Sequence, residues 1–412
     1  MSEQSNIPKH WQIKKLGEVC DVLDNLRKPV NSTERQHRIA EKNQSELFPY
    51  YGATGQVGWI DSFLTNGEYI LIGEDGAPFL DIYKDKAYKI KGKAWVNNHA
   101  HILKGKEQYL IDDYALYYLN SINYRKFVNG TTRLKLTKSN LVDIPFIIPP
   151  IPEQLAIVSK IEELLSDLEN GKKQLQTAQQ QLKVYRQSLL KLAFEGKLTN
   201  QNVKNGELPV GWKWVTLDYV CQNVEYGSAT KSKKTGKVPV LRMGNIQNGK
   251  LDWEDLVFTD NQEEIEKYLL KKGDVLFNRT NSAEWVGKSA QYKGERPAIF
   301  AGYLIRINRI KSLIDETYLT YFLNTHFAKS YGNSVRSFGV NQSNINGTKL
   351  KTYPIPICSL DEQQLIVSEL ESKLTICDKI EETISYSLKQ AEKLRQSILK
   401  KAFEGKLINC DI

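Results

Sequence analysis

The feature that most constrains the fold is a 14-residue stretch that the chain contains twice. Residues 187–200 read QSLLKLAFEGKLTN and residues 396–409 read QSILKKAFEGKLIN, so 11 of the 14 positions are identical at an offset of 209. The same offset relates Glu153-Gln154 to Glu362-Gln363. A period this long lies far outside the range of solenoid repeats. The repeat therefore indicates a duplicated module.

Each copy carries an apolar pattern that is typical of one long helix. Apolar residues recur at every seventh position, which is the spacing of a coiled-coil seam. Pro152 can begin the first helix, and Gly196 and Gly405 are placed as C-terminal caps. Each helix is expected to span roughly 40 residues, or about 60 Å. The alternative of two unrelated surface helices is disfavoured, because an isolated apolar stripe must be buried somewhere. The predicted seam residues are Ile161, Leu168, Leu175, Leu182, Leu189, Leu370, Cys377, Ile384, Ala391 and Ile398.

Antiparallel pairing of two helices of equal length also predicts a register. Lys172 of the first helix and Glu381 of the second should then lie near one another in the middle of the seam. Polar groups at such positions commonly fix the register of a coiled coil.

A second, weaker repeat marks the start of each domain. Residues 7–20 and 208–221 share a Pro, a Trp, a Leu, a Val and a Cys. The predicted order is a domain at 1–150, a helix at 151–200, a domain at 201–358 and a helix at 359–412. Both domains contain short Val-, Ile- and Tyr-rich runs bounded by Gly and Asn, which favour strands and hairpins. We predict an α+β fold with largely antiparallel sheets, joined by an antiparallel coiled coil, with an internal pseudo-two-fold repeat.

The composition is that of an ordinary soluble globular protein, with 41% apolar and 25% charged residues. No apolar run approaches the ~18 residues of a membrane span, and the N-terminus lacks a signal pattern, so a cytoplasmic location is expected. The five cysteines form no C-x-x-C pair, and neither a disulfide framework nor a zinc site follows from them. Cys20, Cys221 and Cys377 are expected to be small buried apolar groups.

The positive charge is concentrated in the two domains. The chain has 57 basic and 48 acidic residues, a net charge of +9. The net charge is +3 over residues 1–150 and +7 over 201–358, but +1 and −2 over the two helical segments. A basic surface suggests a polyanion as partner. Charge alone leaves an ordinary solvated surface equally open.

Three motifs that suggest site chemistry lack the residues that the chemistry needs. Residues 286–289 read VGKS, but Ser282 stands where a phosphate-binding loop needs its first glycine. Residues 148–151 read IPPI and lack the amide and the aromatic ring that an amino-methyltransferase loop uses. His99 and His101 can share one face of a strand, but no third metal ligand is near in sequence. No catalytic residues and no metal site are predicted.

The sequence resembles one family, the specificity (S) subunits of type I restriction–modification systems. The resemblance covers essentially the whole chain and is carried by YYGATGQVGWI, NNHAHIL, GTTRLKLTKSNL, GDVLFNRTNS and both AFEGKL repeats. It implies two target-recognition domains, each reading one half of a split DNA site. It also implies that the helices dock two methyltransferase subunits, and that motor–nuclease subunits join the restriction complex. The chain itself would have no catalytic activity and no cofactor, because S-adenosylmethionine, ATP and Mg would be bound by the partner subunits.

The internal repeat supports the same function independently. Tandem modules with antiparallel helices are related by a pseudo-two-fold axis, and DNA has local two-fold axes perpendicular to its own. Because the two domains differ in sequence, the half-sites should differ, which predicts an asymmetric, bipartite, gapped DNA site. One alternative is a nuclease or methyltransferase with its own active site, which would require a cofactor or metal constellation. The other is a coiled-coil adaptor, which does not explain two divergent basic domains.

Candidate DNA-binding residues follow from the side-chain chemistry of DNA contacts. Base contacts need Arg, Lys, Asn or Gln at loop tips, while phosphate contacts need any well-placed donor. A solvated surface charge is the alternative for each residue taken singly. The candidates are Lys89, Lys91, Lys93, His99, Arg133 and Lys135 in the first domain, and Lys231, Lys233, Lys234, Arg242, Arg279, Asn281, Lys288 and Arg336 in the second.

Overall fold

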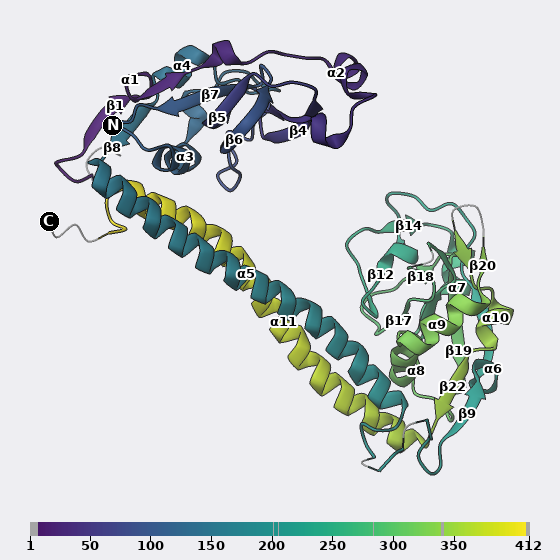
Figure 1. Ribbon diagram of the computed structural model, residues 1–412. Coiled ribbons are helices and arrows are strands. Elements are labelled where there is room, and N and C mark those ends of the chain that lie inside the picture. Colours follow the sequence, from purple (N-terminus) through teal and green to yellow (C-terminus); the bar gives the residue numbers. More distant parts are fainter. Residues whose placement is uncertain (1–6, 201, 205, 283, 339–341, 409–412) are drawn as a thin grey trace. The chain divides into compact units, whose positions relative to one another are not determined.

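The computed structural model of the chain describes residues 7–200, 202–204, 206–282, 284–338 and 342–408 (Figure 1). The chain forms two compact units. Unit 1 consists of Met1–Gln176 and Ile384–Ile412, and unit 2 consists of Thr177–Thr383. The two longest helices, α5 (Ile151–Phe194) and α11 (Leu360–Phe403), each contribute one segment to each unit.

Unit 1 is built on a six-stranded sheet with the strand order β2-β7-β5-β6-β3-β4. All neighbouring strands in it are antiparallel except β3 and β6, which run parallel. A separate antiparallel pair, β1 and β8, precedes α5. The elements are β1 (Gln12–Lys15), α1 (Leu16–Val19), β2 (Cys20–Val22), η2 (Asp24–Leu26), α2 (Ser32–Ile39), η3 (Gln44–Glu46), β3 (Phe48–Gly52), β4 (Gly55–Ile60), β5 (Thr65–Gly73), β6 (Ala87–Val96), β7 (Ala100–Gly105), α3 (Asp112–Ser121), η4 (Tyr124–Lys126), α4 (Lys138–Val142) and β8 (Pro145–Ile148).

Unit 2 repeats this plan with shorter strands. Its largest sheet is antiparallel, with the order β10-β19-β15-β17, and a second sheet has the order β14-β11-β18. The β11–β18 pair is parallel. The elements are β9 (Lys213–Thr216), α6 (Leu217–Val220), β10 (Cys221–Tyr226), β11 (Val238–Leu241), η5 (Met243–Asn245), β12 (Ile246–Gln247), β13 (Lys250–Leu251), β14 (Val257–Thr259), α7 (Gln262–Tyr268), β15 (Val275–Asn278), β16 (Thr280–Asn281), β17 (Ser289–Gln291), β18 (Ile299–Phe300), β19 (Leu304–Arg309), α8 (Glu316–Leu323), α9 (His326–Val335), β20 (Ser337–Phe338), β21 (Ser343–Asn344), α10 (Gly347–Lys351) and β22 (Pro354–Ile357).

The repeated phenylalanine of AFEGKL joins each helix end to a domain. In unit 1 the ring of Phe403 packs edge-on against Tyr114 and Tyr118 of α3, with ring centroids 5.3 Å and 5.0 Å apart. In unit 2 Phe194 packs in the same way against Tyr318 and Phe322 of α8, at 4.9 Å and 5.2 Å. Edge-to-face contacts of buried rings add to the hydrophobic gain. The two copies of the motif are alike because each fills the same kind of aromatic site.

The repeated glutamine at the start of each helix ties the helix to its domain through three hydrogen bonds. Gln154 accepts from the Ile111 amide and donates to the carbonyls of Tyr109 and Pro149. Gln363 makes the equivalent set, accepting from the Asp315 amide and donating to two carbonyls. Both side chains are fully buried, where an unpaired amide would be costly.

The predicted glycine caps are confirmed. Gly196 has φ +72° and Gly405 has φ +71°, the left-handed conformation that ends a helix. A Cβ at Gly196 would lie 2.2 Å from Cγ of Pro209, and one at Gly405 would lie 2.4 Å from Cγ of Pro8. Close approach of each domain's first segment therefore excludes a side chain at both positions.

Within each unit the segments of α5 and α11 pack side by side (Figure 1). The seam residues Leu168 and Leu175 are half-buried in unit 1. The other eight are buried: Ile161, Leu182, Leu189, Leu370, Cys377, Ile384, Ala391 and Ile398. The structure gives the two residues of the expected register pair other partners. Glu381 accepts from Arg186 at 3.0 Å, and Lys172 pairs with Glu169 at 3.1 Å.

The predicted fold class, mixed α+β with mostly antiparallel sheets and two paired long helices, is confirmed. Cys20, Cys221 and Cys377 are buried, as expected, and burial raises the pKa of the Cys20 thiol to about 12. Cys410 lies outside the described residues. No helix among the described residues is long and apolar enough to cross a membrane.

Candidate nucleic-acid interface

Three loops at one end of the unit 1 sheet bring together His99, Arg133 and Lys135. The carboxylate of Asp75 contacts His99 Nδ1 at 2.6 Å and Arg133 Nη2 at 2.7 Å. The carboxylate of Glu74 contacts Lys135 Nζ at 2.9 Å. Backbone hydrogen bonds from Glu74 to the His99 carbonyl and from Leu136 to the Glu74 carbonyl hold the loops together. The Arg133 side chain remains 61% exposed and the Lys135 side chain 50% exposed, so both can reach a ligand.

A buried polar network supports these loops from below. Arg27 bridges Asp24 and Glu74, and it also donates to the carbonyls of Asn98 and Ala100. Burial opposes ionisation of Asp24 and Glu74, but the cationic and hydrogen-bonding neighbours outweigh it and lower the pKa of both carboxyl groups. The network keeps both acids charged and fixes the loop positions.

His101 belongs to this buried support. Its side chain is completely buried, with Nδ1 2.8 Å from Asp24 Oδ2 and Nε2 2.9 Å from the Leu136 carbonyl oxygen. His99 and His101 therefore contact different carboxylates and do not converge on one point. The described residues contain no group of three or more His, Cys, Asp or Glu side chains that could hold a metal ion.

The three lysines of β6 are engaged by other side chains. Lys89 contacts Asp113 at 2.8 Å and Glu68 at 3.7 Å. Lys91 contacts Glu68 at 2.7 Å. Lys93 lies over the ring of Phe63, at 4.8 Å from its centroid. The sequence could not show these partners, and the two carboxylates offset part of the charge that Lys89 and Lys91 offer to a polyanion.

The corresponding end of unit 2 holds Arg279 and Asn281. Arg279 stacks its guanidinium over the Tyr226 ring at 4.7 Å and donates to the Gly302 carbonyl at 3.1 Å. Asn281 lies on β16, which pairs with β21. The corresponding bridge in unit 1 pairs Asp75, just after β5, with Lys135, just before α4. The repeated scaffold thus presents different side chains at equivalent places.

The remaining candidates of unit 2 lie on separate loops. Lys231 and Lys234 are exposed. Lys233 pairs with Asp260 at 3.2 Å, and Arg242 pairs with Asp255 at 3.1 Å. Arg336, which ends α9, donates to Asn333.

Lys288 has surroundings that the sequence did not predict. Its ammonium group lies 3.3 Å from the centroid of the Trp285 ring and donates to Gln247 Oε1 at 3.2 Å. Lys329 of α9 is close enough that its charge lowers the pKa of Lys288, although burial of Lys288 is the larger cause. Sequence reasoning missed Trp285, Gln247 and Lys329, because three separate segments bring them together.

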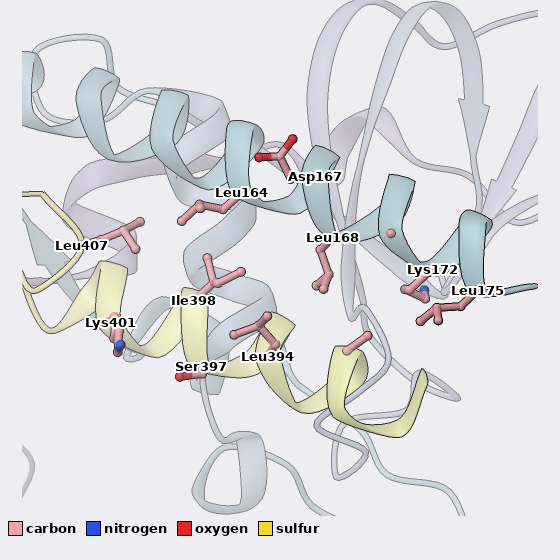
Figure 2. A pocket seen from close by; sticks show the side chains of 12 residues that line it. Leu164, Asp167, Leu168, Lys172, Leu175, Leu394, Ser397, Ile398, Lys401 and Leu407 are labelled. Atoms are coloured by element: carbon pink, nitrogen blue, oxygen red, sulfur yellow. The ribbon is translucent and has the colours of Figure 1, made fainter. Parts of the chain in front are cut away.

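An apolar groove lies between the α5 and α11 segments of unit 1 and has a volume of about 520 Å³ (Figure 2). The groove has room because two of the residues that line it, Gly171 and Ala391, are small. At the offset of 209, unit 2 has Ile380 and Leu182 in these places. The larger side chains that line the groove are Leu164, Asp167, Leu168, Lys172, Leu175, Leu394, Ser397, Ile398, Lys401 and Leu407.

The family model of the type I restriction modification DNA specificity domain matches residues 8–177 and again residues 209–390. The chain belongs to this family. It is 30% identical to a putative type I restriction enzyme specificity subunit of Haemophilus influenzae over 391 residues, which cover 92% of each chain. It is also 27% identical to the EcoKI specificity subunit of Escherichia coli over 312 residues, covering 73% of this chain and 67% of that one.

Two solved structures share the fold of this family member. One, from a study of complex assembly and conformational transition of the type I R–M system, has a TM-score of 0.72 at 19% identity, covering 97% of this chain and 99% of that chain. The other is the HsdS subunit from Thermoanaerobacter tengcongensis, with a TM-score of 0.59 at 18% identity, covering 98% of this chain and all of that one. At these identities the comparison shows the fold and nothing finer.

Proposed function

We propose that the chain is the non-catalytic DNA-recognition subunit of a type I restriction–modification complex and reads an asymmetric, bipartite, gapped DNA site. The observation that carries this proposal is the repeated scaffold with two different polar ends. Unit 1 presents His99, Arg133 and Lys135 around Glu74 and Asp75, whereas unit 2 presents Arg279 and Asn281 on the loop that corresponds to Glu74 and Asp75. Different side chains on a repeated scaffold can recognise different half-sites, because individual side chains read the base edges.

The partners follow from the family and the helices. We propose that the paired helices dock two methyltransferase subunits and that motor–nuclease subunits join the complex for restriction. S-adenosylmethionine, ATP and Mg would then be bound by those subunits and not by this chain. The excess of positive charge in residues 1–150 and 201–358 supports a DNA partner for the domains. A DNA-processing complex of this kind acts in the cytoplasm.

Single substitutions in the two units test whether each unit reads its own half-site. The Arg133→Ala and Asn281→Ala variants are expressed with the methyltransferase partner, and methylated sites are mapped genome-wide. Each should relax or weaken recognition in one half-site only, and a lost bidentate base contact costs about 1–3 kcal/mol of discrimination. Lys15→Ala serves as control, because Lys15 lies on β1, away from the candidate loops, and pairs with Asp143 at 2.7 Å.

Two outcomes would contradict the proposal. One is a change in the base preference of both half-sites from either single substitution, with folding intact. The other is methyl transfer from labelled S-adenosylmethionine by the chain alone, because that would indicate an active site of its own.

A further inference from the structure

Lys288 and Lys329 in unit 2 lie where positive charges are unfavourable. Burial lowers the pKa of both ammonium groups, and the charge of Lys329 lowers the pKa of Lys288 further. The carboxylate of Glu284 raises the pKa of Lys288, but less than Lys329 lowers it. Among the described residues, no carboxylate forms an ion pair with either lysine. Two neighbouring, partly buried cations without an anion repel each other and lose hydration.

The polypeptide holds the two lysines together in a defined way. Asn324, between α8 and α9, accepts from the Ser289 amide and donates to the Ser289 carbonyl. These two hydrogen bonds fix the start of α9, which carries Lys329, against β17, whose first residue follows Lys288. Gln247 of β12 orients the Lys288 ammonium from a third segment.

One side of this site is open to solvent. Trp285 forms a wall beside Lys288 and is 42% exposed. Lys329 lies in the first turn of α9, where the helix dipole disfavours a cation and favours an anion. A bound anion would reduce the repulsion between the two lysines, and it would interact favourably with the dipole of α9.

We propose that Lys288 and Lys329, with Trp285 beside them, bind one backbone phosphate of the DNA half-site that unit 2 reads. This inference rests on the proposed function. A phosphodiester suits the site, because it carries a single charge that two ammonium groups can share. Such a contact positions the duplex and carries no base information.

The test uses the complete complex with the methyltransferase partner and the duplex containing its methylated site. Affinity is measured from 50 to 200 mM salt for Lys288→Met, Lys329→Met and the double variant. Neutralising one phosphate contributes about 0.9 to the slope of log affinity against log salt. Between 50 and 200 mM salt the double variant should therefore lose about 3.5-fold less affinity than the wild type loses, and each single variant should fall between the two. Lys213→Met is the matched control, because Lys213 also lies over an aromatic ring, that of Tyr219 at 5.0 Å.

A methylphosphonate scan of the second half-site locates the contact. In the wild-type complex one neutralised phosphate should reduce affinity, and in the complex of the Lys288→Met, Lys329→Met double variant the same change should have no further effect. The methylated sequence should stay unchanged, because the phosphate contact is not a base contact. The Lys329→Met variant should melt no earlier than the wild type, since removing one of two repelling cations cannot weaken the fold electrostatically. Lys329→Arg should retain the salt slope.

An unchanged salt slope in the double variant, an additive methylphosphonate effect in that variant, or an altered half-site would overturn the inference while leaving the proposed function intact. If the wild-type complex itself shows no sequence-specific, salt-dependent binding, the proposed function and the inference are both wrong.

Discussion

Two glycines in helices allow the same substitution to be tested with opposite expected results. Gly171 lies in the interior of α5, and a Cβ built on it would have no heavy atom within 4 Å. Gly332 lies in α9, and a Cβ there would lie 2.3 Å from Oη of Tyr353. Helix propensity favours alanine over glycine by about 1 kcal/mol at both positions. Packing should therefore decide the sign of each change.

We expect Gly171→Ala to stabilise unit 1 by up to about 1 kcal/mol, because the gain in helix propensity meets no steric cost. For a unit of this size, about 1 kcal/mol corresponds to a rise in Tm of about 2–4 °C. The substitution also adds a methyl group to the wall of the groove that Gly171 lines.

We expect Gly332→Ala to destabilise unit 2. Tyr353 is 1% exposed, so its ring cannot simply swing into solvent. Overpacking of a buried site costs about 1–3 kcal/mol. Most of this range is larger than the gain of about 1 kcal/mol from helix propensity. The net change should be a fall in Tm of a few degrees, by about 2–4 °C per kcal/mol.

Differential scanning calorimetry with both variants measures the two effects on one chain. The two units can unfold in separate transitions, so the shift is read from the transition that each substitution moves. A Gly332→Ala, Tyr353→Phe double variant is the control, because it removes the hydroxyl that the new methyl group would meet. A rise in Tm for Gly332→Ala, or a fall for Gly171→Ala, would refute the reasoning from packing.

Three further predictions concern charge and catalysis. Because the pKa of Glu74 is lowered in the folded chain, its stabilisation is present above the ordinary value of 4.5 and is lost as pH falls through the folded value. Glu74→Gln should therefore be less stable than wild type at pH 7 and should converge with it in acid melts, and a constant difference would contradict this. Arg186→Met should destabilise unit 2 by no more than about 1 kcal/mol, because Arg186 pairs with Asp378 and Glu381 at a partly exposed site. The difference in Tm should shrink at 1 M salt, and a salt-independent difference would point to packing. The purified chain should transfer no methyl group from labelled S-adenosylmethionine above a blank.

The sequence alone determined the long helices, their C-terminal caps and the two-domain order. These features depend on residues that are close in sequence. A seven-residue apolar period and a glycine at a helix end act within one or two turns, and they leave a readable pattern. The repeat added the internal symmetry, because two nearly identical copies of one stretch predict two alike helices.

Only the tertiary structure decided which cations are available and which are already paired. Lys89 and Lys231 look alike in sequence, yet Lys89 is half-buried and contacts Asp113 and Glu68, whereas Lys231 is exposed on its loop. Lys288 and Lys329 are 41 positions apart in the chain, and the hydrogen bonds between Asn324 and Ser289 bring the segments that carry them together. The partner of Glu381 was likewise Arg186 and not Lys172, which antiparallel pairing of equal helices had predicted. Ion pairs and burial are set by contacts between distant segments, and no local period records them.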